Sequence, residues 1–434
     1  MNRIYPVSVA IALLCQVGSP WGIVAPDTNH ANLRGAHAAE QGTASCPTDE
    51  QRLPLSAFNI YRGETHAHSV YTWSHGAHRA DGGGALKTDW DQQSYRNHQG
   101  PPGKYFERAK AQGFDFFVIT DHSQEKPLQP VDPQRNAAWL DTLAAAEQST
   151  DDKFIAMAGF EYSRNPPFDA DRTGTGHINA INVAEYVNAE HMSIPEFYNW
   201  LTRAAPVGGE GCVVASFNHP GRTQFQDWAY LDDDIIELVA MFELRTVYRG
   251  PPRWAAYVRA LNRGWKVSPI SVTDSHGYWH LENIPPLTYV LAPELTKAAL
   301  TRAMRQRRTY TSWAGQRNTQ VDLKYSVNGY VMGSTLNEPT TLEFYVQITT
   351  HPDDPGQGVR RIQVLRNHPT DLDGVQVAAE AFFDGNETEI MWTTTIDDSV
   401  SRYFLLRVYH NSDMQDGVFN EHGSTYAAPV WTGR

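Results

Sequence analysis

The chain has 434 residues, enough for two or three domains. Its hydrophobic fraction of 41% and charged fraction of 20% are ordinary for a globular protein. The formal net charge of −13 argues against nucleic acid or an anionic membrane surface as a partner, because both favour a basic surface. A small-molecule substrate is compatible with this charge, and an anionic one would need bound cations that set the local field.

The first 38 residues have the pattern of a secretory signal peptide. Arg3 supplies the positive start, and the apolar run at residues 7–17 is too short to span a bilayer. Ala36-His37-Ala38 offers a small-residue cleavage site, with residues 24–25 as a nearer alternative. We therefore expect a secreted or periplasmic protein without a membrane span. The alternative is a disordered tail that begins with a chance apolar run.

The three cysteines bear on the redox compartment. Cys15 would leave with the signal peptide, so Cys46 and Cys212 remain. In an oxidising compartment these two could pair. Cys212 opens the apolar run at residues 212–215, however, so we expect a buried, unpaired thiol and keep the disulfide as the alternative. Cys46 lies too far from the first apolar run to favour a lipoprotein.

Residues 39–57 are polar, contain Pro and Gly, and indicate a linker. From residue 58 to 315, strand-like runs alternate with amphipathic, helix-like stretches. The strand-like runs are residues 58–65, 114–120, 154–160, 177–183, 212–218, 235–244 and 265–273. The helix-like stretches include residues 104–112, 136–148, 194–204 and 253–263. This alternation implies parallel strands joined by right-handed crossovers, and seven such units predict a closed or nearly closed (β/α)7 barrel.

The pattern changes after the segment Thr309-Tyr310-Thr311-Ser312, which closes the barrel region. Residues 316–434 contain short strand-like runs separated by turn residues, without a helical period. The runs are residues 321–326, 341–348, 361–366, 375–381, 389–394, 403–409 and 427–431. This pattern is typical of a small all-β sandwich. We therefore predict an α/β barrel over residues 58–315, followed by a C-terminal β-sandwich domain over residues 316–434.

Metal-ligand residue types gather at the ends of the predicted strands, where α/β barrels carry their active sites. They are His66-Ala67-His68, Asp121-His122, Glu161, His177, His219 and Asp274-Ser275-His276. His177 is the exception, because it precedes its apolar run. Imidazole and carboxylate without thiolate suit Zn²⁺, Mn²⁺ or Fe. Nine such donors are too many for one tetrahedral ion but suffice for two or three ions that share a bridging carboxylate.

The order and spacing of these segments resemble the motifs of the PHP (polymerase and histidinol phosphatase) metallohydrolase superfamily. The resemblance covers residues 58–315 and is carried by Tyr61-Arg62-Gly63-Glu64-Thr65-His66-Ala67-His68-Ser69, Phe117-Val118-Ile119-Thr120-Asp121-His122, Gly159-Phe160-Glu161, His177, Asn218-His219-Pro220 and Thr273-Asp274-Ser275-His276. The chain looks most similar to the secreted CehA/McbA-type and DUF3604-type members. The resemblance implies a distorted (β/α)7 barrel and two or three divalent metal ions, either Mn, Zn or Fe.

The same resemblance implies three ligand sets. His66, His68, Glu161 and Asp274 would form one, His122 and His276 a second, and His177 and His219 a third, with Glu161 bridging. The family also has an Asp or His six residues after its second His, where this chain has Ser74 followed by His75. Either the loop is one residue longer and His75 is the ligand, or one metal position is lost. The sequence is therefore compatible with a two-metal site and with a three-metal site.

The leading expectation is a metal-dependent hydrolase, a PHP-type phosphoesterase that cleaves a small ester through a metal-activated hydroxide. Glu161, Asp121 and Arg222 are the candidate catalytic residues. Asp121 would orient a neighbouring ligand, and Arg222 would clamp a phosphate or carboxylate or else be a solvated loop residue. Glu243 could be a site wall or a salt-bridge partner. The alternatives are hydrolysis of a carbamate, amide or carboxylester at the same site, or a non-catalytic surface binding protein.

Overall fold

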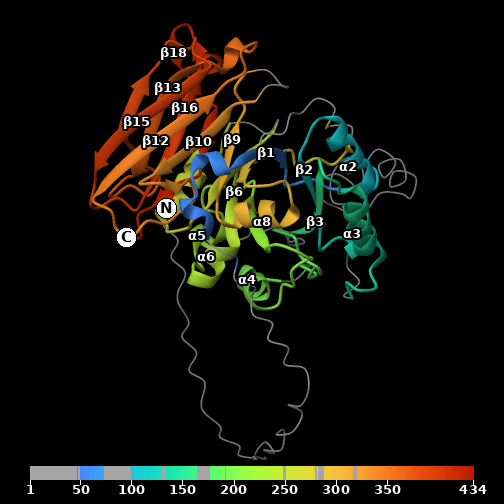
Figure 1. Cartoon of the computed structure of the whole chain (residues 1–434). Helices are drawn as coiled ribbons and strands as arrows, with labels where there is room; N and C mark the ends of the chain where they lie inside the picture. The colour runs from blue at the N-terminus through green and yellow to red at the C-terminus, as the bar shows by residue number, and fades with distance from the viewer. Residues whose placement is uncertain are drawn as a thin grey trace, which may run out of the picture. The chain divides into compact units, whose positions relative to one another are not determined.

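The computed structural model describes residues 46, 49–72, 99–128, 132–163, 176–190, 192–247, 251–278, 281, 288–315 and 320–434. All of them belong to one compact unit, Thr43–Arg434. The structure is mixed α/β, with a large central sheet and an all-β C-terminal region (Figure 1). The predicted signal peptide, Ser74 and His75 lie outside the described residues. The boundaries predicted for the linker, barrel and sandwich stay predictions.

Seven strands that follow the predicted runs lie side by side in chain order in the central sheet. They are β1 (Asn59–Glu64), β2 (Phe116–His122), β3 (Ile155–Tyr162), β4 (His177–Ile181), β5 (Val214–Asn218), β6 (Val239–Thr246) and β7 (Ser268–Val272). The expectation that all of them are parallel is wrong, because β4 pairs antiparallel with both β3 and β5. The sequence between β3 and β4 has no helix-like pattern, and a parallel pair needs a long crossover that is usually a helix.

The sheet continues past β1 through two further strands. β8 (Thr288–Ala292) pairs antiparallel with β1, and β9 (Thr309–Ser312) pairs antiparallel with β8. The closed barrel is therefore not confirmed, because β8 occupies the free edge of β1. The sheet nevertheless curls, since an isolated parallel bridge joins Ala67 to Ser275 and the Asp274 N–H donates to the His66 carbonyl at 3.1 Å. The residues that follow β1 thus lie against the residues that follow β7.

Among the described residues, four helices follow the stretches predicted at residues 104–112, 136–148, 194–204 and 253–263, and the other three lie where no helix-like stretch was predicted. The helices are α2 (Pro102–Ala111), α3 (Ala137–Ser149), α4 (Ile194–Arg203), α5 (Gln224–Trp228), α6 (Asp233–Leu238), α7 (Trp254–Asn262) and α8 (Lys297–Arg305), with short 3-10 turns at Asp49–Arg52, Leu55–Ala57, Lys126–Leu128, Pro355–Gln357 and Asn411–Asp413. The run at residues 235–244, predicted as one strand, divides into α6 and β6. The reason is a helix start signal, because the Asp232 side chain accepts a hydrogen bond from the Ile235 N–H at 2.8 Å.

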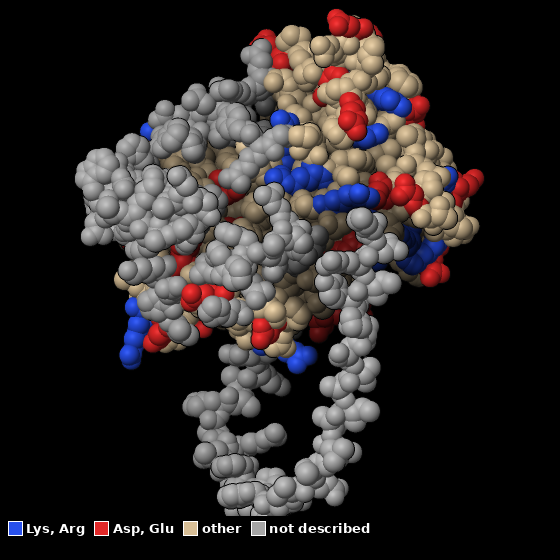
Figure 2. Space-filling view, turned by 180° about the vertical axis from the view of Figure 1, so that it is seen from behind, with Lys and Arg blue, Asp and Glu red and all other residues tan. Residues whose placement is uncertain are grey.

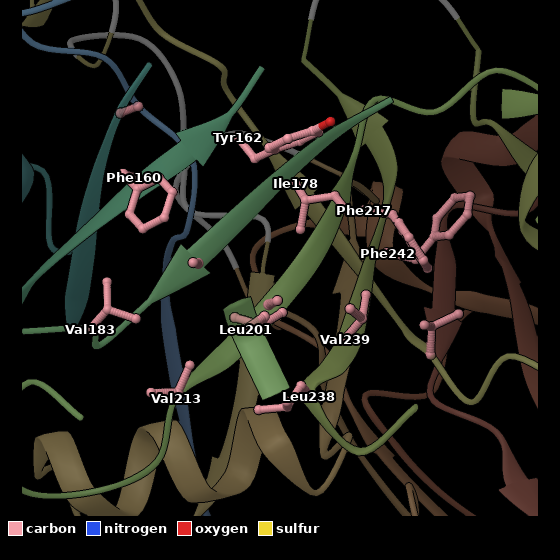
Figure 3. Packing of buried hydrophobic residues seen from close by; sticks show 14 of the residues in the cluster. Phe160, Tyr162, Ile178, Val183, Leu201, Val213, Phe217, Leu238, Val239 and Phe242 are labelled. Carbon is pink, nitrogen blue, oxygen red and sulfur yellow. The ribbon is translucent and has the colours of Figure 1, made fainter. Parts of the chain in front are cut away.

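The two faces of the strands carry different layers, because adjacent residues on a strand point to opposite sides. Phe160, Phe217 and Phe242 face one apolar cluster together with Leu201 of α4 (Figure 3). The alternate residues, such as Met157, pack in another cluster with side chains of α8. Glu161 is four residues beyond Met157 and therefore points to the α8 side of the sheet.

The C-terminal region is all-β, and two sheets share one apolar cluster there, in which the Phe344 and Phe404 rings lie 5.9 Å apart. The first sheet has the order β11 (Tyr330–Val331), β10 (Asp322–Val327), β12 (Thr341–Thr349) and β15 (Glu389–Asp397). The second has the order β14 (Val375–Phe382), β13 (Val359–Asn367), β16 (Tyr403–His410) and β19 (Thr425–Ala427). Beside them are β20 (Val430–Trp431), which pairs with β16, and the hairpin of β17 (Met414–Gln415) and β18 (Val418–Phe419). β19 pairs with β9, so the second sheet continues the central sheet.

Cys46 and Cys212 form a disulfide, with their Cα atoms 5.9 Å apart. The expectation that Cys212 is an unpaired thiol is wrong. The pairing could not be predicted from the sequence, because 166 positions separate the two residues and burial of Cys212 fits either state.

In the described part of the chain, no helix combines the length and the apolar character that crossing a membrane requires. Acidic and basic side chains are interspersed on the face shown in Figure 2.

Candidate metal centre

The predicted ligand residues sit at one edge of the curled sheet. His122 ends β2, Glu161 is the next-to-last residue of β3, and His219 directly follows β5. The antiparallel direction of β4 explains the exception of His177. As the first residue of β4 it pairs with Asn218, the last residue of β5, so it lies at the same edge as the C-terminal ends of its neighbours.

One oxygen of Glu161 faces three imidazoles. Its Oε2 lies 2.7 Å from His122 Nε2, 3.3 Å from His66 Nε2 and 3.4 Å from His68 Nε2. Asp274 Oδ1 adds a second carboxylate, 3.1 Å from His68 Nε2 and 3.7 Å from His66 Nε2. All five side chains are buried. The structure therefore brings together the set His66, His68, Glu161 and Asp274 and places His122 beside it.

The other oxygen of Glu161 faces a different pair of imidazoles. Its Oε1 lies 3.0 Å from His177 Nδ1 and 3.5 Å from His219 Nε2. Asn218 donates a hydrogen bond to the same oxygen at 2.8 Å and fixes the carboxylate in this orientation. Glu161 therefore stands between two imidazole sets, which is the arrangement that a bridging ligand requires.

His276 lies at the rim of this cluster. Its Nδ1 is 3.7 Å from Asp274 Oδ1, and its ring centroid is 4.3 Å from that of His68 and 6.4 Å from that of His122. Among the residues that the structure describes, three groups have donor atoms that all lie within 4.8 Å of one another. They are His66/His68/Asp274, His66/Glu161/His219 and His68/His122/Glu161. His122 thus groups with His68 and Glu161, whereas the resemblance paired it with His276.

The electrostatics of the cluster are set by burial and by the crowding of unlike charges. Burial opposes charge on every member, but the surrounding imidazoles hold the pKa of Glu161 and of Asp274 well below its usual value. Glu161 raises the pKa of His122 to about 10 against the effect of burial. Burial, with His122 and His66 nearby, lowers the pKa of His68 to about 3. The carboxylates are therefore ionised, and at least one imidazole is a neutral donor.

The donor set fits divalent metal ions. The Nε2 atoms of His66 and His68 face each other at 2.9 Å, so at most one proton can lie between them. Glu161 Oε2 is buried and makes no hydrogen bond to any described residue, although three ring nitrogens surround it. Imidazole nitrogens and carboxylate oxygens that converge in this way are the ligands that Zn²⁺ and similar ions bind.

Asp121 acts on the loop of His68 rather than on the ring of His122. It accepts hydrogen bonds from the Ser69 N–H at 2.8 Å, the Ser69 hydroxyl at 2.6 Å and the Thr72 hydroxyl at 2.8 Å. The Thr72 hydroxyl in turn lies 3.3 Å from His68 Nδ1. Asp121 is therefore placed to orient a ligand, and its catalytic role stays a prediction.

Two buried glutamates complete the site, and the sequence-based set of ligands omits both. Glu64 accepts hydrogen bonds from the N–H groups of His66 at 2.9 Å and Thr273 at 2.8 Å, so it ties the end of β1 to the end of β7. Burial raises its pKa to about 8. Glu243 contacts His66 Nδ1 and the His219 N–H. The signal that could have found both is a carboxylate within two residues of the end of an apolar strand.

Arg222 forms an ion pair with a residue outside the cluster of candidate ligands. Its guanidinium, 60% exposed, pairs with Asp373 of the C-terminal region, and Asp373 also binds Arg259 at 3.0 Å. Its predicted role as a substrate clamp stays a prediction, and the ion pair would have to open for that role.

The loop after His219 contains a left-handed turn. Phe225, Gln226 and Asp227 have φ values of 54° to 56° and ψ values of 40° to 46°, a backbone conformation that residues other than glycine rarely adopt. Burial of Phe225 and an ion pair of Asp227 with Arg259 at 2.6 Å hold the turn. The Phe225 ring fills the space that a Cβ on Gly176 would need, next to His177. The turn thus packs against the start of β4.

Comparisons with known proteins give limited likeness. No protein-family model and no curated protein matches the sequence. Among solved structures, the chain is similar to a two-domain protein from Bacteroides vulgatus that contains a predicted PHP-like metal-dependent phosphoesterase. The identity is 14% and the TM-score 0.42, over 87% of this chain and 97% of that one. A β-glucosidase from Listeria innocua matches at 11% identity and a TM-score of 0.16, over 47% of this chain and 39% of that one.

Proposed function

We propose that the protein is a metal-dependent hydrolase of the PHP type that cleaves a small ester, foremost a phosphoester. The observation that carries the proposal is the position of Glu161, whose two oxygens face two imidazole sets at 2.7 Å and 3.0 Å. The order of the sequence motifs supports the PHP assignment. The contact of Ala67 with Ser275 supports a distorted barrel as its framework.

The residues of the site fall into two classes, those that would bind metal and those that orient the metal-binding side chains. His66, His68, His122 and Asp274 would hold metal on one side of Glu161, and His177 and His219 on the other. Divalent ions would supply Lewis acidity toward the ester oxygens and lower the pKa of water from about 15.7 to near 7. Asn218 fixes the Glu161 carboxylate, and Asp121 fixes the loop of His68. Burial of the carboxylates keeps bulk water from competing for the donor atoms.

We also propose that the protein is secreted or periplasmic. The disulfide between Cys46 and Cys212 supports this, because disulfides persist in oxidising compartments. The signal-peptide pattern before residue 39 points the same way. Recovery of chains cut near residue 38 from the periplasm or medium would support the proposal, and full-length chains found only in the cytoplasm would contradict it.

The reaction is tested with chromogenic phosphomonoesters, phosphodiesters, carboxylesters and carbamates, each assayed with Mn²⁺, Zn²⁺ and Fe²⁺. We expect turnover of a phosphoester that disappears when the protein is stripped of metal and returns when metal is restored. Turnover of a carbamate or carboxylester alone would keep the metal centre but change the substrate class. Full metal loading without turnover of any ester would favour a binding protein over an enzyme.

A further inference from the structure

Glu243 is a buried carboxylate that contacts two of the candidate ligand residues at once. It lies on β6, and its side chain is 0% exposed. Its Oε1 is 2.5 Å from His66 Nδ1, and its Oε2 accepts a hydrogen bond from the backbone N–H of His219 at 2.6 Å. It belongs to none of the three groups of converging donor atoms among the described residues.

The contact with His66 fixes which ring nitrogen is available. With the Glu243 carboxylate as acceptor, His66 Nδ1 is the donor, and the ring turns its other nitrogen, Nε2, toward the cluster. That atom faces His68, Glu161 and Asp274. In many metal sites, a carboxylate that accepts a hydrogen bond from a ligand histidine orients the imidazole ring in the same way.

The contact with His219 fixes a backbone in an unfavourable conformation. His219 has a φ of 31°, in the left-handed region that residues other than glycine rarely occupy. The hydrogen bond from its N–H to Glu243 holds this conformation, in which the ring Nε2 lies 3.5 Å from Glu161 Oε1. His66 and His219 face different oxygens of Glu161, and their rings stack with centroids 5.8 Å apart, so Glu243 holds two adjacent ligand residues.

We propose that Glu243 is a positioning residue that couples the two ligand sets. One carboxylate orients His66 in the first set and His219 in the second, so its loss weakens metal binding at both. This inference rests on the proposed metal centre and not on the identity of the ester. A role in stability alone would leave metal affinity unchanged, so affinity is the readout that separates the two roles.

The test compares two isosteric changes, Glu243→Gln and Asp413→Asn. A glutamine has one acceptor oxygen, so either His66 Nδ1–H or the His219 N–H loses its acceptor. Asp413 is the matched control, a buried carboxylate of the C-terminal region that accepts hydrogen bonds from the N–H groups of His410 at 2.8 Å and Ser424 at 3.0 Å. Zn²⁺ stoichiometry and affinity are measured on metal-stripped protein by competition with a chromophoric chelator, beside a thermal melt of the metal-free protein.

We expect Glu243→Gln to bind Zn²⁺ about 10- to 100-fold more weakly at both positions. Asp413→Asn should lower the melting temperature and leave the affinity at the wild-type value. Glu243→Asp separates position from charge, because it keeps the charge but is one methylene too short to reach both partners. It should remain weakened, and it carries the test if Glu243→Gln does not fold.

Wild-type affinity in folded Glu243→Gln would overturn the proposal. So would full recovery in Glu243→Asp, which would reduce the role of Glu243 to its charge. A wild-type protein that binds no metal would overturn this inference together with the metal centre. A wild-type protein that binds metal but hydrolyses no ester would overturn only the proposed reaction.

Discussion

The disulfide between Cys46 and Cys212 joins the segment before β1 to the residues that lead into β5. Next to it, Glu50 forms ion pairs with Arg302 at 2.9 Å and with the buried Arg308 at 2.5 Å. These contacts fasten the chain before β1 to the region around α8. The disulfide therefore closes a loop that contains β1, β2, β3 and β4.

Removal of this disulfide should destabilise the protein markedly. By the chain-entropy estimate, a loop of 166 positions is worth up to about 5 kcal/mol, because the cross-link restricts the unfolded chain. The double variant Cys46→Ser/Cys212→Ser, which leaves neither thiol free, should unfold at a clearly lower urea concentration. Reductant should lower the midpoint of the wild type but not that of the variant. Equal midpoints for the two proteins without reductant would show that the disulfide does not stabilise the fold.

The left-handed turn after His219 predicts a stabilising substitution. Gln226 is exposed and has a φ of 54°, which costs an L-residue about 1–2 kcal/mol and a glycine little. Gln226→Gly should therefore raise the free energy of unfolding by about 0.5–1 kcal/mol, after allowance for the greater freedom of glycine in the unfolded chain. Ala229→Gly is the control, because Ala229 has a φ of −68° and should lose stability. If both variants lose stability equally, the turn is not strained.

The sequence predicted the elements well where local pattern determines them. The apolar runs predicted as strands at residues 114–120 and 212–218 correspond to β2 and β5, and the amphipathic stretch at residues 194–204 corresponds to α4. The sequence did not predict the features that depend on how distant segments pair in the folded protein. The position of His177 made sense only once β4 proved antiparallel, and nothing local to residues 177–183 shows strand direction.

The supporting contacts of the site could not be read from the sequence for a related reason. Glu243 contacts His66 across 177 positions, and Asn218 contacts Glu161 across 57. Neither residue type is rare at the end of a strand, so only the folded arrangement selects them. The pairing of β19 with β9 likewise joins distant segments, and the sequence-based division into two domains did not foresee one continuous sheet.

Asp398, between β15 and β16, should make stability depend on acid pH. Burial opposes its ionisation, but hydrogen bonds from Ser401 and Val400 and the ion pair with Arg366 outweigh burial and lower its pKa to about 2. The folded state thus holds the carboxylate ionised at a pH where the unfolded chain, with a pKa of about 3.9, is protonated. Its stabilisation, up to about 2 kcal/mol, is present above pH 4 and is lost as the pH falls through about 2.

Asp398→Asn should therefore lower the free energy of unfolding at pH 7 and approach the wild type near pH 2. Urea unfolding curves of both proteins at several pH values measure this difference. A difference that stays constant from pH 7 to pH 2 would mean that the carboxylate charge does not contribute.

Glu161→Gln should be the most damaging isosteric change at the metal centre. A glutamine can present its oxygen to only one of the two imidazole sets, and its amide N–H groups then face the other. Loss of the charge also increases the repulsion between cations on either side. We expect the loss of at least one metal ion per chain and a fall in turnover of more than about 100-fold, beyond the 10- to 100-fold typical of residues that only orient a ligand.

Asp121→Asn is the comparison for Glu161→Gln, because Asp121 acts on His68 indirectly, through its hydrogen bonds with Ser69 and Thr72. It should keep the full metal content and lose activity by about 10- to 100-fold. Elemental analysis of chelator-treated and reloaded proteins, together with turnover of the best chromogenic ester, measures both variants. Full metal occupancy with near wild-type turnover in Glu161→Gln would show that the carboxylate does not bridge the two sets, and the two-sided geometry around Glu161 would then have no catalytic meaning.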